Sequence, residues 1–311
     1  MSPARVRHRR VSKFRSKYTK KNFNFKRIFL VFSLAVFLVL SFIVVALLLN
    51  KNKINMAVGG KTGAVYVSSF DFEAKKITTF VIPATAELEV SRSLGKWKAK
   101  SLWQLGINEK LGGTLLSETV TRNFHFPIFL WADNLALGFS EGGVAKALTA
   151  LFAPYKTNLG IMDRIRLFFI AVTVKSFDRE VTDLSKTSYL RKTKLADGEE
   201  GYVVTKNLPQ ELIYLFTETL INEKETRVEI IDLTGTYGVS EGVGATVEVL
   251  GAKILATTKG PPNDSDCLVL GKDRLIVGKI AKVFSCKEGK GNDNDRFDIQ
   301  IKIGKKFAQR F

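Results

Sequence analysis

The chain has 311 residues, which is long enough for two domains with separate hydrophobic cores. Its formal net charge is +18, but the first 27 positions contain eleven Lys and Arg and no acidic residue, which leaves +7 for the others. The excess charge is confined to this tail, and its two interpretations are a topogenic segment beside anionic lipid and nucleic-acid binding through phosphate contacts. The positive-inside rule alone accounts for the charge, so no nucleic-acid partner is expected. The two Cys have no C-x-x-C spacing, and His8 and His125 are the only His. The composition therefore supports neither a zinc site nor histidine-dependent catalysis.

An apolar segment follows the basic tail of residues 1–27. Residues 28–49, IFLVFSLAVFLVLSFIVVALLL, contain no charged side chain and would span about 33 Å as a helix. The apolar region of a cleaved signal peptide is only about 7–15 residues long, so we predict an uncleaved transmembrane helix. Only Lys51 and Lys53 follow it closely, and the positive-inside rule then predicts a cytoplasmic N-terminus. The tail would contact membrane lipid, and the bulk of the chain would lie outside the plasma membrane.

Strands and helices alternate between residues 63 and 186, which predicts an α/β domain. The segments 64–70 and 77–82 are rich in β-branched and aromatic residues and flank the turn DFEAKK, so an antiparallel hairpin is expected. Residues 50–63, NKNKINMAVGGKTG, are polar and glycine-rich and are expected to form a linker. The other expected elements are helices at 109–124, 142–155 and 161–177 and a strand at 127–134.

A second domain is expected at residues 227–311. Residues 187–226 are polar at first and then contain PQELIYLFTETLINEKE, which predicts a linker followed by a connector helix beginning at Pro209. Residues 227–311 have the order β-α-β-β-α-β, a known small-domain arrangement. Its expected strands are 228–233, 252–258, 267–270 and 297–303, and its expected helices are 239–250 and 273–284. The expected fold class is α/β, with an N-terminal transmembrane helix, an α/β domain and this small C-terminal domain.

Both cysteines lie in the second domain. Cys267 opens an expected strand, and Cys286 closes the helix that follows it. A helix that returns antiparallel to its strand brings these two ends to the same side of a domain. A Cys267–Cys286 disulfide is therefore geometrically reasonable, provided that the Cα atoms come within about 7 Å. The inferred location outside the cytoplasm favours the disulfide over two buried free thiols.

The run FDFEAKKITTFVIPATAELEV, at 70–90, resembles the LytR–CpsA–Psr (LCP) family of cell-envelope proteins, in which an Arg-Asp pair follows the Ile-Pro. The likeness continues through LGGTLLSETVTRNFHFPI and DRIRLFFIAVTVKS, and the last domain is similar to the LytR C-terminal domain. The resemblance implies one transmembrane helix followed by an extracytoplasmic α/β domain. It also implies transfer of a phospho-glycopolymer from a polyprenyl pyrophosphate carrier to the cell wall. In such a reaction arginines bind the pyrophosphate and carboxylates hold magnesium.

This sequence departs from the family pattern at the residues that carry the chemistry. Ala84 and Thr85 stand where the family has the Arg-Asp pair, and Gly63 and Ala64 stand where it has an upstream acidic residue. In the helix that carries RxxRQQ in the family, Arg164 matches the first arginine, but apolar residues replace the second arginine and the glutamines. Electrostatic stabilisation is usually the largest catalytic contribution, so we predict no catalytic residue, no metal site and no cofactor.

The leading hypothesis is therefore an envelope-assembly protein that binds or scaffolds without turnover. Its expected partners are membrane lipid and a polyprenyl-phosphate lipid or a cell-wall polymer. Arg164 and Arg166 are candidate anion-binding residues, and the alternative for this pattern is a helix cap at Asp163 with solvated arginines. Further basic side chains that could grip a phosphate follow the altered turn, namely Arg92, Lys96, Lys98 and Lys100. The alternative function is a divergent LCP-type phosphotransferase with relocated magnesium ligands.

Overall fold

The structure is a computed structural model that describes residues 29–34, 37–38, 41, 52–205, 214–291 and 296–311. The chain divides near residue 47, and the residues from 48 on belong to one compact unit, Leu48–Phe311. The two domains within this unit stay a prediction, and their names are kept below for the parts that contain its separate sheets. The predicted basic tail and most of the predicted transmembrane helix lie outside the described residues, and the described positions of that helix are helical. Among the described residues, no helix combines the length and the apolar character needed to cross a membrane.

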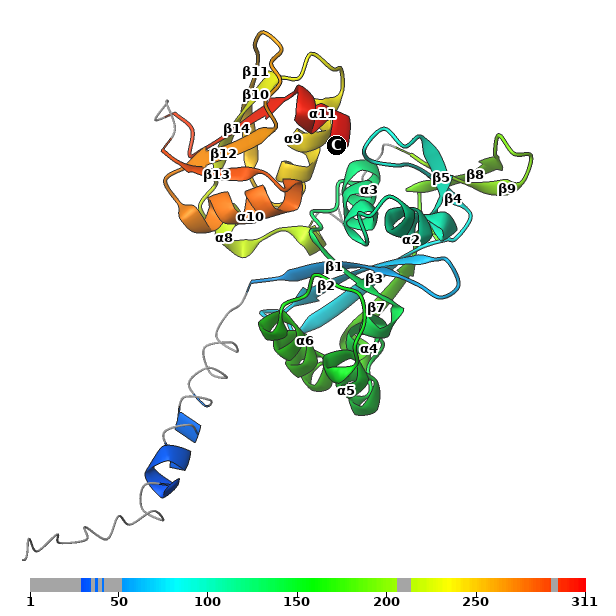
Figure 1. The fold of residues 1–311 in the computed structure, drawn as a ribbon, viewed down its shortest axis with the longest axis vertical. Helices are drawn as coiled ribbons and strands as arrows, with labels where there is room; N and C mark the ends of the chain where they lie inside the picture. The colour runs from blue at the N-terminus through cyan, green and yellow to red at the C-terminus, as the bar shows by residue number, and fades with distance from the viewer. Residues whose placement is uncertain (1–28, 35–36, 39–40, 42–51, 206–213, 292–295) are drawn as a thin grey trace, which may run out of the picture. The chain divides into compact units, whose positions relative to one another are not determined.

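A five-stranded sheet organises the first domain (Figure 1). Its order is β6-β1-β2-β3-β7, in which the successive strands β1, β2 and β3 are antiparallel and the two edge strands pair parallel. The strands are β1 (Ile54–Gly59), β2 (Val65–Asp71), β3 (Lys76–Ile82), β6 (Leu130–Asp133) and β7 (Arg179–Asp183). The predicted hairpin is confirmed as β2 and β3. The predicted linker at 50–63 is wrong where it contains β1, because Ile54, Met56 and Val58 are buried beneath the helices.

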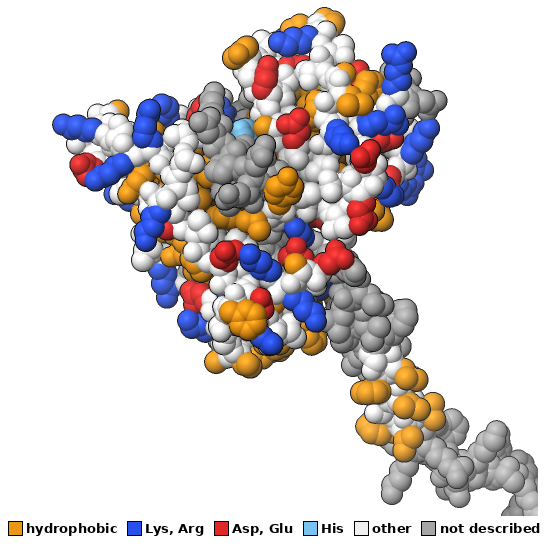
Figure 2. All heavy atoms as spheres, turned by 180° about the vertical axis from the view of Figure 1, so that it is seen from behind, with side chains coloured by type: hydrophobic (Ala, Val, Ile, Leu, Met, Phe, Trp, Pro, Cys, Tyr) orange, Lys and Arg blue, Asp and Glu red, His pale blue; other side chains and the backbone are white. Residues whose placement is uncertain are grey.

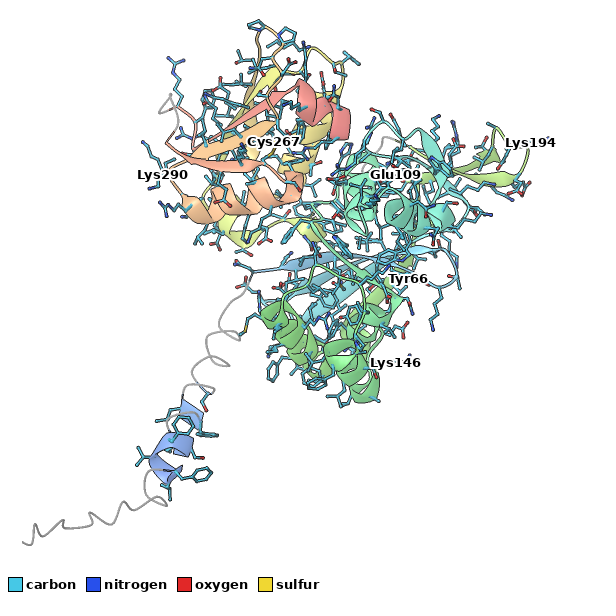
Figure 3. All side chains as sticks on the ribbon, in the orientation of Figure 1. Tyr66, Glu109, Lys146, Lys194, Cys267 and Lys290 are labelled. Carbon is cyan, nitrogen blue, oxygen red and sulfur yellow. A yellow bond between two sulfur atoms is a disulfide. The ribbon has the colours of Figure 1, made fainter. Side chains whose placement is uncertain are left out.

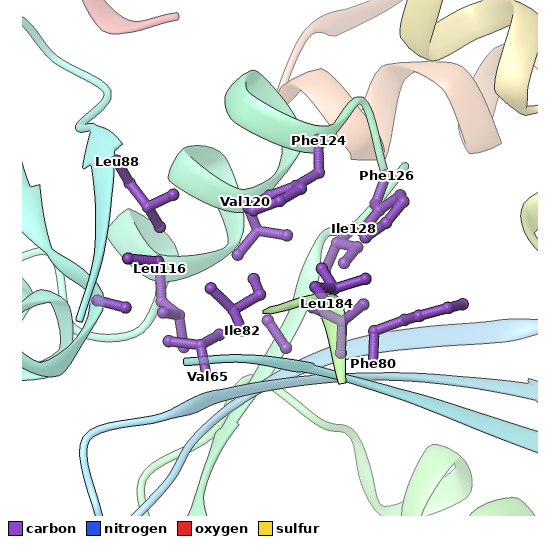
Figure 4. Close-up of a cluster of buried hydrophobic side chains, with 14 of the residues drawn as sticks. Val65, Phe80, Ile82, Leu88, Leu116, Val120, Phe124, Phe126, Ile128 and Leu184 are labelled. Atoms are coloured by element: carbon purple, nitrogen blue, oxygen red, sulfur yellow. The ribbon is translucent and has the colours of Figure 1, made fainter. Parts of the chain in front are cut away.

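Helices cover both faces of this sheet (Figure 1). On one face lie α2 (Ala99–Asn108) and α3 (Thr114–Phe124), and on the other lie α4 (Gly138–Glu141), α5 (Val144–Phe152) and α6 (Ile161–Thr173). Side chains of a strand point alternately to the two faces, so Phe80 and Ile82 join the α2–α3 core whereas Ile77 joins the α4–α6 core. Figure 4 shows the α2–α3 core, where the Phe126 ring centre lies 5.5 Å from that of Phe80.

The sequence does not predict α2, and the helix expected at 109–124 begins at Thr114 instead. The backbone N–H groups of Leu111 and Gly112 both donate to the carbonyl of Gly106 at 2.8 Å, and this ends α2. Gly112 then adopts a φ of +57°, in the left-handed region that glycine enters without a steric penalty. The chain therefore turns sharply between two separate helices where the sequence pattern suggests one.

A four-stranded sheet with the order β5-β4-β9-β8 completes the first domain. Its strands are β4 (Ala86–Glu89), β5 (Lys96–Lys98), β8 (Leu190–Lys194) and β9 (Glu200–Val204). The predicted linker at 187–226 is therefore wrong up to residue 204, because this stretch is a hairpin that buries Tyr189 in the α2–α3 core. Its polar composition reflects exposed strands joined by ion pairs such as Lys192–Glu200 at 2.6 Å. The start of the predicted connector helix at Pro209 lies outside the described residues, and its later part contains α8 (Thr219–Glu223).

The C-terminal domain contains a second five-stranded sheet, with the order β11-β10-β14-β12-β13. Its elements are β10 (Arg227–Leu233), α9 (Val239–Val249), β11 (Lys253–Lys259), β12 (Cys267–Gly271), α10 (Arg274–Phe284), β13 (Lys287–Lys290), β14 (Ile299–Gly304) and α11 (Lys305–Arg310). The predicted order is confirmed up to α10, and the predicted last strand is β14. β13 is additional, because the sequence KEGK at the sheet edge has no apolar pattern from which to predict a strand. The likeness to a LytR C-terminal domain stays a prediction.

Cys267 and Cys286 form a disulfide, as predicted, and the alternative of two free thiols is wrong. Cys267, labelled in Figure 3, begins β12, and Cys286 follows the end of α10. The return path of the helix brings their Cα atoms to 4.9 Å. In the chain-entropy account, closing this loop stabilises the domain by about 3 kcal/mol.

Candidate functional site

The departing positions of the β1–β2 turn and of the segment after β3 lie together at one end of the central sheet, whereas those of α6 do not. This end contains the carboxyl ends of β1 and β3, which run in the same direction, and the turn between β1 and β2. A Cβ atom added to Gly63 in this turn would lie 3.6 Å from the Cβ atom of Ala84, which follows β3. The carbonyl of Ala84 accepts a hydrogen bond from the backbone N–H of Lys100 at 3.1 Å. The β1–β2 turn, the segment after β3 and the start of α2 therefore lie next to one another.

A groove of about 580 Å³ opens at this end of the sheet. Its lining includes Lys61 from the β1–β2 turn and Trp97, Lys100, Ser101 and Gln104 from β5 and α2. No acidic side chain lines it, and within the described part of the chain neither lysine has a carboxylate at ion-pair distance. The Trp97 ring is 43% exposed and is oriented by a hydrogen bond from its Nε1 to the carbonyl of Leu94 at 2.9 Å. The groove can therefore hold an anion beside an exposed aromatic face.

The other predicted basic side chains beyond the turn already have acidic partners. Arg92 pairs with Glu118, Lys96 lies 3.9 Å from Glu87, and Lys98 pairs with Asp197 and Glu199. Two parallel hydrogen bonds of 2.8 Å from Arg92 to Glu118 raise the pKa of Arg92. Hydrogen bonds to its two carboxylates likewise raise the pKa of Lys98. Of these four residues, Lys100 is the one that lines the groove without such a partner among the described residues.

Arg166 lies at the opposite end of the central sheet. The residue is 8% exposed, and its Nη2 donates to the carbonyl of Asn52, just before β1, at 2.9 Å. The guanidinium carbon lies 4.3 Å from the centre of the Phe72 ring, and burial lowers the pKa of Arg166. Since β1 runs from Asn52 toward the groove, roughly 20 Å of strand separates Arg166 from it. Arg166 therefore contributes to packing at the start of β1 rather than to the groove.

Arg164 is also occupied by protein groups. Its guanidinium carbon lies 4.3 Å from the centre of the Tyr155 ring, and Nη1 donates to the carbonyl of Ala153 at 3.4 Å. Burial raises the pKa of Tyr155 to about 12, although the neighbouring Arg164 acts in the other direction. The cap at Asp163 is present, because its Oδ2 accepts the N–H of Gly160 at 3.2 Å, but solvation of both arginines is not observed. Anion binding by Arg164 and Arg166 stays a prediction.

The end of β1 does not fit a magnesium centre built by the protein. A Cβ atom on Gly59 would lie 2.8 Å from Cε3 of Trp103, whose ring packs edge-on against Trp131 with 6.1 Å between centres. Asp133, in register with Gly59 on β6, instead accepts the N–H of Leu135 at 3.0 Å. In the described ranges, no group of three or more His, Cys, Asp and Glu side chains could hold a metal ion. Magnesium is usually held by one or two carboxylates together with waters and phosphates, and Asp133 is already engaged by a backbone N–H.

Sequence reasoning missed the other polar side chains that line the groove with Lys100. Lys61 lies in GGKTG, which has the composition of a linker, and only the β1–β2 turn brings it to α2. Ser101 and Gln104 belong to α2, which was not predicted. One signal was present, because Gln104 follows Lys100 by four residues and would share its face on any helix.

No protein-family model and no curated protein sequence matches the chain. Among solved structures, TagT from B. subtilis is similar at 13% identity and a TM-score of 0.35, covering 50% of this chain and 86% of TagT. TagV from B. subtilis is similar at 10% identity and a TM-score of 0.38, covering 50% of this chain and 92% of TagV. A LytR-CPS2A-psr family protein, YwtF (TagT) with bound octaprenyl pyrophosphate lipid, is similar at 13% identity and a TM-score of 0.35. The match covers 50% of this chain and 85% of that protein. At these TM-scores the likeness decides neither the family nor the activity of this chain.

Proposed function

We propose that the chain is a membrane-anchored, extracytoplasmic envelope protein that binds a phosphate-bearing glycan ligand in the groove without turning it over. The ligand is an anionic wall polymer or its polyprenyl-phosphate carrier, since both present a phosphate group. One observation carries the proposal: Lys61 and Lys100 line a groove with no acidic side chain and have no acidic partner among the described residues. The uncharged segment 28–49 supports the anchor, and the sequence resemblance supports the envelope location.

The chemistry of the groove favours binding over catalysis. Two ammonium groups without acidic neighbours attract a phosphate as point charges, whereas arginines would grip it in a bidentate manner. Ser101 and Gln104 add hydrogen-bonding groups for sugar hydroxyls, and the exposed Trp97 ring adds an apolar face. Ala84 supplies no charge at the position where the resembled family has an arginine. The groove therefore has groups that hold an anion but lacks the arginine and the carboxylates that the resemblance implies for stabilising a leaving pyrophosphate.

The proposal is tested by binding measurements on the full chain in lipid nanodiscs. The probes are undecaprenyl phosphate and a soluble poly(glycerol phosphate), which distinguish the lipid carrier from the polymer. The double variant Lys61→Ala, Lys100→Ala is expected to weaken binding roughly tenfold, because exposed charge pairs contribute up to about 1 kcal/mol each. The matched control is Lys110→Ala, Lys194→Ala, two exposed lysines outside the groove. Equal weakening in both variants, or no binding of either probe, contradicts the proposal.

Asp133 favours the alternative of a divergent phosphotransferase. This carboxylate ends β6 beside the end of β1, close to the edge on which the groove opens. Its Oδ1 is engaged as a helix cap, and the described residues do not complete a metal site around it. The alternative requires magnesium-dependent turnover of a pyrophosphate lipid by the wild-type chain and its loss in Asp133→Asn. Turnover that survives in Asp133→Asn would assign the reaction to other residues.

A further inference from the structure

The outer surface of α5 and α6 is apolar, although it faces away from the sheet. Six exposed side chains define this α5–α6 apolar face, namely Val144, Leu148, Phe152, Ile161, Met162 and Val172. Phe152 is 77% exposed and Ile161 is 75% exposed. Figure 2, seen from behind, shows hydrophobic side chains alongside charged ones at the lower end of the folded part, the end that carries α4, α5 and α6 in Figure 1. Contiguous exposed apolar surface of this kind marks an interaction site rather than ordinary solvent contact.

The two helices present these side chains as one surface. They pack antiparallel. The start of α5 meets the end of α6, because Val144 and Val172 line the same cavity of about 250 Å³. The end of α5 meets the start of α6, because Arg164 donates to the carbonyl of Ala153. On α5 the exposed apolar residues recur every four positions, and on α6 they lie near its two ends. The opposite side of each helix is buried in the α4–α6 core. A water-facing helix normally has polar residues at these outer positions. α5 has two, namely Lys146, which pairs with Glu141 at 2.8 Å, and Thr149, whose hydroxyl donates to the carbonyl of Ala145 at 3.0 Å.

The chain enters the folded domain beside the same helix. The carbonyl of Asn52 accepts a hydrogen bond from Arg166 of α6 at 2.9 Å, and Oδ1 of Asn52 accepts one from Lys279 at 3.1 Å. The next residue, Lys53, pairs with Asp71 at 3.1 Å, so the start of β1 is fixed on both sides. The apolar segment 28–49 ends three residues before Asn52, which corresponds to at most about 11 Å of extended chain.

We infer that the α5–α6 apolar face rests on the outer leaflet of the membrane that holds residues 28–49. This inference depends on the proposed anchor. With Asn52 bound to α6 and tied closely to the apolar segment, the bilayer surface is the apolar phase nearest to this face. An apolar helical surface enters about 5–10 Å into the boundary between head groups and acyl chains. Exposed Lys156 and Lys175 flank the face and complement anionic head groups (Figure 3 shows Lys146 on the same side).

The test places a nitroxide label on the face in the full chain, reconstituted into vesicles of phosphatidylglycerol and phosphatidylethanolamine. Phe152→Cys and Ile161→Cys each add one reactive thiol, because the native cysteines are joined in a disulfide. The matched control is Tyr237→Cys, which replaces an aromatic side chain that is 92% exposed in the C-terminal domain. Power saturation with oxygen and a water-soluble nickel complex is expected to place labels 152 and 161 about 5–10 Å below the phosphates and label 237 in water. The inference is overturned if the labels at 152 and 161 are as accessible to the nickel complex as the label at 237.

Two further measurements separate this result from the anchor and from other occupants. Alkaline extraction that releases the chain from the vesicles overturns the anchor and the inference with it, whereas a retained chain with water-exposed labels overturns the inference alone. Spectral broadening at label 152 that disappears on dilution with unlabelled chain assigns the face to a second copy and also overturns it. Phe152→Asp combined with Ile161→Asp is expected to leave the melting temperature unchanged and to move a label at position 172 into water. A label at 172 that stays in lipid contradicts the inference.

Discussion

The two helical layers of the central sheet are similar on their inner sides and different on their outer sides. Each layer buries aliphatic and aromatic residues against the sheet in its own core. On the outside, α2 presents Lys100 and Gln104, whereas α5 presents Leu148 and Phe152. The shared inner chemistry explains why both layers fold onto one sheet, and the different outer chemistry indicates what each layer meets. A polar layer suits a charged ligand in water, and an apolar layer suits a lipid phase.

The largest expected contrast comes from the same substitution in the two layers. Phe126 is fully buried and stacks on Phe216 at 4.5 Å between ring centres, so Phe126→Ala should cost about 3–5 kcal/mol of unfolding free energy. Phe152 is 77% exposed, so Phe152→Ala should change the unfolding free energy by less than about 0.5 kcal/mol. Urea unfolding of the full chain in detergent, followed by tryptophan fluorescence, measures both. Similar costs for the two variants would show that Phe152 is packed against the protein.

A smaller effect is expected where an indole occupies the end of β1. Gly59→Ala places a Cβ atom 2.8 Å from the ring of Trp103 and should cost about 1–3 kcal/mol by overpacking. The fluorescence of the native state should change as well, because Trp103 must shift. Gly244→Ala in α9 is the matched control, since its Cβ would meet its nearest neighbour at an ordinary 3.5 Å. A neutral Gly59→Ala variant with unchanged fluorescence would mean that this end of the sheet has room for a larger group.

Substitutions at the two ends of the central sheet should have different effects, one on stability and the other on phosphate binding. Arg166→Met keeps the volume of the side chain but removes the hydrogen bond to Asn52, which should cost about 1–2 kcal/mol of unfolding free energy. It should leave the affinity for poly(glycerol phosphate) unchanged. Lys61→Ala combined with Lys100→Ala should weaken the binding of poly(glycerol phosphate) and leave the unfolding free energy unchanged, because both lysines are exposed. Weaker phosphate binding in Arg166→Met at unchanged stability would instead support the sequence-based assignment of anion binding to Arg166.

Sequence reasoning succeeded where burial follows a regular period or where order along the chain decides the geometry. The β2–β3 hairpin has β-branched and aromatic strands around a polar turn, and α6 has an unbroken apolar run after Arg166. The disulfide required only that a helix return along its strand, which places Cys286 beside Cys267. These inferences use local pattern and direction of the chain, and they need no knowledge of distant contacts.

The unpredicted parts depend on contacts between residues far apart in sequence. β1 has polar and glycine-rich flanks, and only its position between β2 and β6 explains the burial of Met56. The β8–β9 hairpin is polar because its strands are exposed, so its composition is that of a linker. In the candidate site, Lys100 belonged to the predicted basic group, but Lys61 did not, because it reaches α2 only through the folded turn. A tertiary groove is not visible as a pattern along the chain.

The smallest expected effect concerns the side-chain caps at the first turns of α10 and α5. α5 begins with no side-chain cap, whereas in α10 the carboxylate of Asp273 accepts the N–H of Leu275 at 2.9 Å and pairs with Lys224 at 2.5 Å. Asp273→Ala should cost about 1 kcal/mol, and Asp273→Asn should cost less because an amide oxygen still caps the helix. The hydrogen bond from Lys224 holds the pKa of Asp273 below its ordinary value. The carboxylate therefore stabilises the fold fully above about pH 4, and this contribution is lost as the pH falls through the lower folded-state pKa.

Urea unfolding at pH 7 and at about pH 2, followed by circular dichroism, measures the effect of the cap. The stability difference between wild type and Asp273→Asn should shrink at the lower pH, because both chains then have an uncharged cap. A difference that stays constant with pH would mean that the charge of Asp273 does not contribute. In α5, Thr149→Ala at an exposed position should show no such pH dependence, because no carboxylate caps the first turn of that helix. A helix without a side-chain cap must be stabilised by its faces, so α5 depends on the sheet on its inner side and, in our proposal, on the membrane on its outer side.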